Sequence, residues 1–195
     1  MALDVTAICE KYDTDKHKGE FPHSKMYDTL FAPLRDKPIS LLEIGINRGG
    51  SVRLWEEYFS EASLYAIDVR QRCLREASDR TTVDLVDQSN TDALRAYAEK
   101  RGDFDIIIDD GSHMTGHQIL TFDTLWPHVK PGGIYVVEDT QTSYDWRFVD
   151  SEVTAVEYFR SMIHEVNMSV KKRSEGTKDI ETLMFKRDMI VVTKR

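Results

Sequence analysis

The chain has 195 residues, which is enough for one domain, and its 41% hydrophobic and 31% charged residues exclude a disordered or fibrous protein. A formal net charge of -8 argues against a nucleic-acid binder, which needs a basic face. No run approaches the roughly 20 apolar residues of a membrane helix, no signal peptide is evident and two cysteines make no disulfide framework, so we expect a cytoplasmic protein without membrane association.

Five short apolar runs follow a polar N-terminal region, residues 1–38, which we expect to form a helical or loop cap over a sheet. Nearly continuous apolar runs are typical of strands buried on both faces, and they lie at residues 39–44, 64–67, 83–86, 104–108 and 134–137. Helical patterns lie between them, at residues 51–59, 90–100 and 115–129. A turn is predicted at Pro131-Gly132-Gly133, before the fifth strand. This alternation predicts a parallel α/β sheet with right-handed crossovers.

The last part of the chain has a different pattern. Residues 151–168 predict one helix with Val153, Phe159 and Ile163 facing inward, and a polar loop follows at 171–179. Two further strands, 180–185 and 189–193, are joined by a tight turn, which forces antiparallel pairing. The sequence therefore predicts a Rossmann-like, doubly wound α/β sheet of parallel strands with a C-terminal antiparallel hairpin, as a single domain over residues 1–195.

Each of the five parallel strands is followed by an acid or a glycine, at the sheet edge where α/β proteins bind ligands. The segment 43–51, Glu-Ile-Gly-Ile-Asn-Arg-Gly-Gly-Ser, allows close backbone approach to a ligand, although Asn47 breaks the dinucleotide-binding spacing. An ordinary tight turn is the alternative for this loop. Asp68 follows about 20 residues later, where an acid can hold a ribose. Asp87 with Gln88 could contact an adenine, or Asp87 could cap the next helix.

Four carboxylates gather at the ends of the fourth and fifth strands, in Asp109-Asp110 and Glu138-Asp139. They would repel each other unless a cation neutralised them, and oxygen ligands suit Mg²⁺ or another hard divalent ion. The alternative is that some of them cap helices or pair with basic residues. His113 lies beside this group and could remove a proton from a hydroxyl, or it could make only a structural hydrogen bond.

The motifs together resemble a known family. The loop 43–51, Asp68 and the terminal antiparallel hairpin resemble class I S-adenosylmethionine-dependent methyltransferases. Four motifs resemble more closely the metal-dependent sugar O-methyltransferases of macrolide and other antibiotic pathways, of the mycinamicin type: residues 11–16 (Lys-Tyr-Asp-Thr-Asp-Lys), the Leu-Glu-Ile-Gly of 42–45, the Asp-Asp-Gly-Ser-His of 109–113 and the segment 133–139.

The resemblance implies S-adenosylmethionine as cofactor and Mg²⁺ or another hard divalent ion as metal. It implies Asp110, Glu138 and Asp139 as metal ligands and His113 as general base. Residues 12–16 would form a lid, and the cap of residues 1–38 would cover the cofactor site. The residues implied in cofactor binding are Tyr12, Lys16, Glu43, Gly45, Asn47, Gly49, Ser51, Asp68, Asp87, Gln88 and Asp109.

The implied function is methylation of a hydroxyl of a sugar, in a glycoside or nucleotide sugar, during natural-product or surface-glycan biosynthesis. The partners expected are a small hydroxylated acceptor and further copies of the chain, but no nucleic acid and no membrane. Two alternatives stay open: a metal-dependent O-methyltransferase of a catechol or polyketide phenol, and a non-catalytic cofactor-binding protein. The acceptor and the position methylated do not follow from the sequence.

Overall fold

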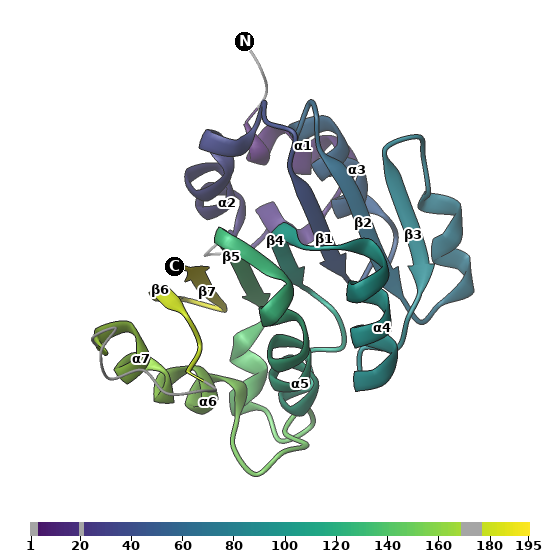
Figure 1. Cartoon of the computed structure of the whole chain (residues 1–195). Coiled ribbons are helices and arrows are strands. Elements are labelled where there is room, and N and C mark those ends of the chain that lie inside the picture. The colour runs from purple at the N-terminus through teal and green to yellow at the C-terminus, as the bar shows by residue number, and fades with distance from the viewer. Residues whose placement is uncertain (1–3, 20–21, 169–176) are drawn as a thin grey trace.

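The computed structural model describes residues 4–19, 22–168 and 177–195, and within them it contains one seven-stranded sheet (Figure 1). The strands are β1 (Ser40–Ile44), β2 (Ser63–Asp68), β3 (Thr81–Leu85), β4 (Phe104–Asp109), β5 (Val129–Glu138), β6 (Ile180–Lys186) and β7 (Met189–Lys194). Their order in the sheet is β3-β2-β1-β4-β5-β7-β6. The first five pair in parallel, whereas β7 is antiparallel to both β5 and β6. This arrangement confirms the predicted fold class and the terminal hairpin.

Helices pack on both faces of the sheet (Figure 1). They are α1 (Val5–Tyr12), α2 (Ser24–Phe31), α3 (Gly50–Tyr58), α4 (Thr91–Arg101), α5 (Thr115–Leu125), α6 (Ala155–Ser161) and α7 (Ile163–Asn167). Side chains alternate across each strand, so Leu41 packs with α1, α2 and α3 on one face and Leu42 packs with α4, α5 and α6 on the other. The two cores cover the faces of the sheet. Ligands of such a sheet bind at the carboxyl ends of the strands, where the chain continues into loops.

An aromatic cluster holds the N-terminal helices on the sheet. The rings of Tyr27 and Trp55 lie 5.0 Å apart at their centroids, and those of Phe31 and Trp55 lie 5.6 Å apart, both edge to face. Such pairs each contribute about 0.5–1.5 kcal/mol beyond the area they bury. The cluster joins α2 to α3 and positions the short 3-10 helix η1 (Asp15–His17), which precedes α2, near the strand ends.

The turn predicted before the fifth strand is wrong, because Pro131-Gly132-Gly133 lies inside β5. Phe104 pairs with Val129 and Ile106 with Ile134, so the intervening residues of β5 bulge opposite β4. A bulge accommodates a proline, which has no N–H to donate, and Gly132 adopts a φ of 76° there.

The single helix predicted over 151–168 is divided in two. Residues 151–154 precede α6, whose first turn is capped by the Thr154 side chain, and Met162 separates α6 from α7. Phe159 is buried as predicted, but Val153 and Ile163 are 50% and 54% exposed. Most of the predicted loop at 171–179 lies outside the described residues. No helix in the described part of the chain is both long and apolar enough to cross a membrane.

Candidate active site

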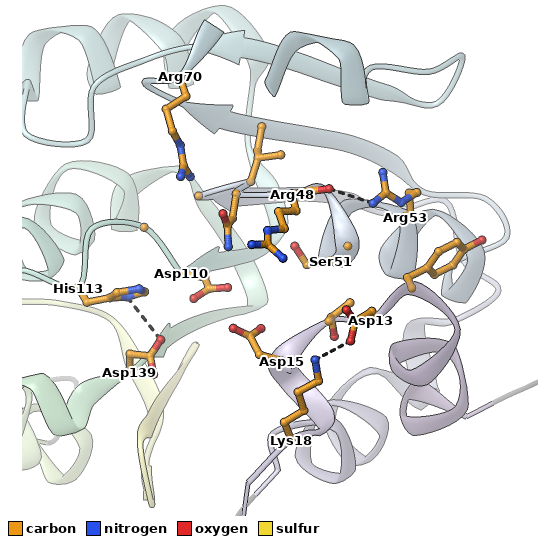
Figure 2. A pocket seen from close by; sticks show the side chains of 17 residues that line it. Asp13, Asp15, Lys18, Arg48, Ser51, Arg53, Arg70, Asp110, His113 and Asp139 are labelled. Carbon is orange, nitrogen blue, oxygen red and sulfur yellow. Dashed lines mark hydrogen bonds and ion pairs between the residues drawn. The ribbon is translucent and has the colours of Figure 1, made fainter. Parts of the chain in front are cut away.

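Three cavities adjoin at the carboxyl ends of the strands. The central cavity, of about 610 Å³, is lined by the loop after β1, the turn around η1 and the ends of β4 and β5 (Figure 2). The lateral cavity, of about 360 Å³, shares Asp110 and Asp139 with it. The Asp68 cavity, of about 580 Å³, shares Gly45 and Gly111 with it. Volumes of this size are typical of small-molecule sites.

Backbone strain is concentrated around these cavities. Among the described residues, the non-glycine residues with positive φ are Asp13, Asn47, His113, Asp139 and Asp188, with φ between 49° and 62°. Every one of them lines the central or the lateral cavity. The left-handed conformation is unfavourable for residues with a Cβ atom and persists where the surrounding structure enforces it, often at functional sites. The loops that carry the candidate residues are therefore held in defined conformations.

The predicted glycine loop packs tightly against its neighbours. Gly45 has a φ of 92°, and a Cβ atom there would lie 2.0 Å from the carbonyl oxygen of Asp110. Gly49 has a φ of 77°, and its Cβ would meet the carboxylate of Glu76. Gly45 brings the backbone of the loop against the end of β4, Gly49 brings it against the Glu76 side chain, and α3 begins directly after Gly49. The loop thereby presents Asn47 and Ser51 to the central cavity.

Glu43 lies beneath this loop and is fully buried. It accepts hydrogen bonds from the Ser51 hydroxyl (2.9 Å) and the Trp55 indole N–H (3.2 Å). Burial raises the pKa of the Glu43 carboxyl to about 7, although the nearby Lys16 ammonium opposes this shift. Ser51 lines the central cavity and Glu43 does not, so the carboxylate supports the loop from below.

Asp68, at the end of β2, lines the Asp68 cavity with its carboxylate already engaged. One oxygen accepts from the backbone N–H groups of Ile46 (3.0 Å) and Asn47 (3.3 Å), and the Arg70 guanidinium donates to both oxygens at 2.9 and 2.8 Å. Burial would raise the pKa of Asp68, but the Arg70 guanidinium and the backbone N–H groups of Ile46 and Arg70 hold it well below its usual range. Sequence reasoning missed Arg70, whose only signal is its place two residues after the acid.

The residues predicted to contact adenine divide into two groups. Asp87 is exposed, lines the Asp68 cavity and accepts hydrogen bonds from Ser89. Gln88 is buried. Its amide nitrogen donates to Asp109 (2.7 Å), and its amide oxygen accepts from the backbone N–H of Ser112 (2.8 Å). Asp109 lines none of the three cavities, and burial raises its pKa to about 7. The Gln88–Asp109 pair therefore supports the loop after β4 from inside the protein.

Asp110, His113 and Asp139 form the group best suited to a cation. Each offers a ligand atom, and these atoms all lie within 4.8 Å of one another. Nδ1 of His113 is buried without a hydrogen-bond partner among the described residues and lies 3.5 Å from Asp139 Oδ2. Figure 2 shows the three side chains converging on the central cavity. Carboxylate oxygens in this arrangement fit a hard divalent ion.

Glu138 lines the lateral cavity with Asp110 and Asp139, but it is not in the group whose ligand atoms lie within 4.8 Å of one another. Its carboxylate also makes hydrogen bonds to Nζ of Lys16 (2.5 Å), Nδ1 of His23 (3.0 Å) and the hydroxyl of Tyr27. Sequence reasoning missed His23 and Tyr27, whose only signal is a spacing of four residues at the start of α2.

The two predicted lid residues point in different directions. Tyr12 lines the central cavity and donates its hydroxyl to Glu57 (2.6 Å). Lys16 lines the lateral cavity instead, where its ammonium also contacts Asp110 at 2.7 Å. Tyr12 thus lies where a cofactor contact was predicted, whereas Lys16 lies among the candidate metal ligands.

Comparison with known proteins finds similar chains among sugar methyltransferases. A tetracenomycin enzyme of Streptomyces olivaceus, 8-demethyl-8-alpha-L-rhamnosyl tetracenomycin-C 2'-O-methyltransferase, is 37% identical over 147 residues, covering 72% of this chain and 38% of that protein. L-olivosyl-oleandolide 3-O-methyltransferase of Streptomyces antibioticus is 32% identical over 194 residues, covering 91% of this chain and 49% of that protein.

The fold and a family model agree with these similarities. The MycE methyltransferase from the mycinamycin pathway, solved with Mg and SAH, superposes with a TM-score of 0.90 at 29% identity, covering 100% of this chain and 55% of that one. The chain thus spans about half, or less, of the length of these three proteins. Residues 42–140, from β1 through the end of β5, match the family model of a methyltransferase domain. The chain therefore belongs to the methyltransferase domain family.

Proposed function

We propose that this chain transfers a methyl group from S-adenosylmethionine to a sugar hydroxyl with the help of a divalent ion, Mg²⁺ in the first place. The named relatives methylate sugars attached to tetracenomycin and oleandolide, and the superposed structure was solved with Mg and SAH. The observation that carries the proposal is that the central and lateral cavities meet at Asp110 and Asp139, with His113 beside them.

The donor would occupy the central and Asp68 cavities, which share Gly45 and Gly111 in their linings. The methionine part would lie against Asn47 and Ser51 in the central cavity. The ribose hydroxyls would donate hydrogen bonds to the Asp68 carboxylate, which requires the Arg70 guanidinium to release it. The adenine would lie toward Asp87 and Gln88, since both line the far end of the Asp68 cavity.

The acceptor would bind in the lateral cavity. Its lining consists of nine ionisable residues and Gly19, namely Asp15, Lys16, Lys18, His23, Asp110, Glu138, Asp139, Arg187 and Asp188. Each hydroxyl of a sugar ring can donate or accept a hydrogen bond, so a sugar can pair with ionisable groups around its whole edge. A catechol or phenol needs apolar walls for its ring. This composition favours a sugar acceptor over an aromatic one.

The residues at the junction can perform the proton transfer that such a reaction needs. A divalent ion held by Asp110, Glu138 and Asp139 would supply Lewis acidity that lowers the pKa of a neighbouring hydroxyl. Asp139 Oδ2 lies 3.5 Å from Nδ1 of His113, beside the imidazole that would accept the hydroxyl proton. The glycine loop fixes the position of the donor, and this positioning supplies the remaining rate enhancement.

We extend the proposal to the organisation of the protein. Residues 1–195 would act as one methyltransferase domain, with α1, η1 and α2 capping the donor site. The chain would act on a free small-molecule acceptor, without nucleic acid or membrane, and would associate into homo-oligomers. Tyr12 and Asp13 line the central cavity from the cap, which supports a lid at residues 12–16.

A direct test is methyl uptake from labelled S-adenosylmethionine by a panel of glycosides, nucleotide sugars and catechols, with Mg²⁺ or with a chelator. We expect Mg²⁺-dependent methylation of a sugar, and its loss in Asp110→Asn with the affinity for S-adenosylhomocysteine nearly unchanged. Asp92→Asn, on the solvent side of α4, is the matched control. Equal turnover with the chelator, or methylation of the catechols alone, would contradict the proposal.

A further inference from the structure

Lys16 places one ammonium group among the ends of three neighbouring strands. Its Nζ lies 2.7 Å from Asp110 Oδ2, 2.5 Å from Glu138 Oε1 and 3.6 Å from Glu43 Oε1, which follow or belong to β4, β5 and β1. The side chain is 1% exposed. An ammonium so completely removed from water is stable only because carboxylates surround it. Lys16 is therefore a built-in cation of the acidic cluster.

The three candidate metal ligands in the lateral cavity carry more negative charge than one divalent ion can balance. Asp110, Glu138 and Asp139 contribute three negative charges, and Lys16, in direct contact with two of these acids, reduces the total to two. The cavity lining also holds two further acids, Asp15 and Asp188, and two further bases, Lys18 and Arg187, whose charges cancel. With Lys16 counted, the cluster matches the charge of a single divalent cation.

We propose that Lys16 is a positioning residue that sets the net charge of the ion site, so that the site selects a divalent over a trivalent cation, and that Lys16 does not contact the donor. The inference rests on the proposed function, because it takes the acids around Lys16 as the ion site. Lys16 donates to Oδ2 of Asp110 and to Oε1 of Glu138, which leaves Oδ1 of Asp110 for the ion.

The charge balance has a consequence for the reaction. When one divalent ion is bound, the three carboxylates, the ammonium and the ion sum to zero. A hydroxyl that passes its proton to His113 would then become an alkoxide beside an imidazolium, with no surplus carboxylate charge at the junction, and would face the positively charged sulfonium of the donor. A surplus carboxylate charge would instead oppose the loss of that proton.

The test measures the affinities of the donor-free protein for Ca²⁺ and for Tb³⁺, a trivalent ion of similar size, by titration calorimetry. In the wild type the Lys16 ammonium repels a bound cation, and this repulsion grows with the charge of the cation. Lys16→Met removes the repulsion. We expect both affinities to rise and the ratio of Tb³⁺ to Ca²⁺ affinity to increase about tenfold or more. Lys16→Arg keeps the charge and should keep the wild-type ratio.

Tyr27→Phe is the matched neutral control, because Tyr27 donates to the same oxygen of Glu138 without carrying charge. Its ratio should equal that of the wild type. If Lys16→Met lowers both affinities in parallel, or shifts both by one factor, Lys16 has only a structural role and the inference is overturned. A wild-type protein that binds neither ion would overturn the proposed ion site, and the inference with it.

Lys16→Met leaves buried acids unpaired and its folding must be checked by thermal unfolding. Glu138→Gln supplies an independent test, since it removes one negative charge while Lys16 stays in place. The ratio of Tb³⁺ to Ca²⁺ affinity should then fall about tenfold, and the double variant Lys16→Met/Glu138→Gln should return it toward the wild-type value. An unchanged ratio in Glu138→Gln would also overturn the inference.

Discussion

Glu43→Gln should make the stability of the protein less dependent on pH. The carboxyl is buried beneath the glycine loop, and burial raises its pKa from 4.5 to about 7 while Lys16, Ser51 and Trp55 oppose the shift. Because the folded-state pKa lies above the unfolded-state value, the unfolded chain loses its proton first as pH rises. The carboxyl therefore does not lower the unfolding free energy below about pH 4.5. Its destabilising effect grows as pH rises toward 7 and reaches its full size above pH 7.

The size of the effect follows from the two pKa values. Between pH 5 and pH 8 the ionisation of Glu43 should lower the unfolding free energy of the wild type by about 2 kcal/mol. Glutamine does not ionise, so the variant has no such loss. The amide oxygen of glutamine can still accept from Ser51 or Trp55, and any change in those hydrogen bonds is independent of pH. The stability of Glu43→Gln relative to wild type should therefore rise by about 2 kcal/mol over this range.

Urea unfolding followed by tryptophan fluorescence at pH 5 and pH 8 measures this difference. Glu99→Gln, at an exposed position of α4, is the control and should follow the wild type at both values. A difference between Glu43→Gln and wild type that stays constant between the two pH values would refute the reasoning. A difference that moves in the opposite direction would show that Lys16 outweighs burial at this carboxyl.

Three further substitutions test the site. Asp68→Asn should weaken binding of S-adenosylhomocysteine about tenfold in calorimetry, since it removes the charge that would hold the ribose; unchanged affinity would reject that contact. His113→Asn tolerates the φ of 60° and should lower turnover about 10²–10⁴-fold without changing donor affinity, whereas a wild-type rate would exclude the imidazole as base. Gly45→Ala should destabilise the protein by about 3 kcal/mol in thermal unfolding, because its Cβ meets the Asp110 carbonyl oxygen. Gly102→Ala, with a φ of 88° and open space around it, measures the backbone strain alone, and an equal loss in both would show that the clash is relieved.

Local pattern was sufficient for most of the fold. The apolar runs predicted β1 to β5 because a strand buried on both faces is predominantly apolar, and the short turn at Arg187-Asp188 required an antiparallel hairpin. The pattern misled at Pro131-Gly132-Gly133, since a bulge within a strand uses the same residues as a turn. It also misled over 151–168, where apolar spacing continued across the break at Met162.

The sequence by itself determined that acids and glycines end the parallel strands, and a parallel sheet must bring those ends to one edge. Only the tertiary structure decided which partners these acids have. Lys16 reaches Asp110 and Glu138 across 94 and 122 residues, and His23 reaches Glu138 across 115. No local spacing encodes such contacts, because they depend on how the helices of the first residues pack over the strand ends. The charge of the ion site is consequently a property of the folded chain rather than of any motif.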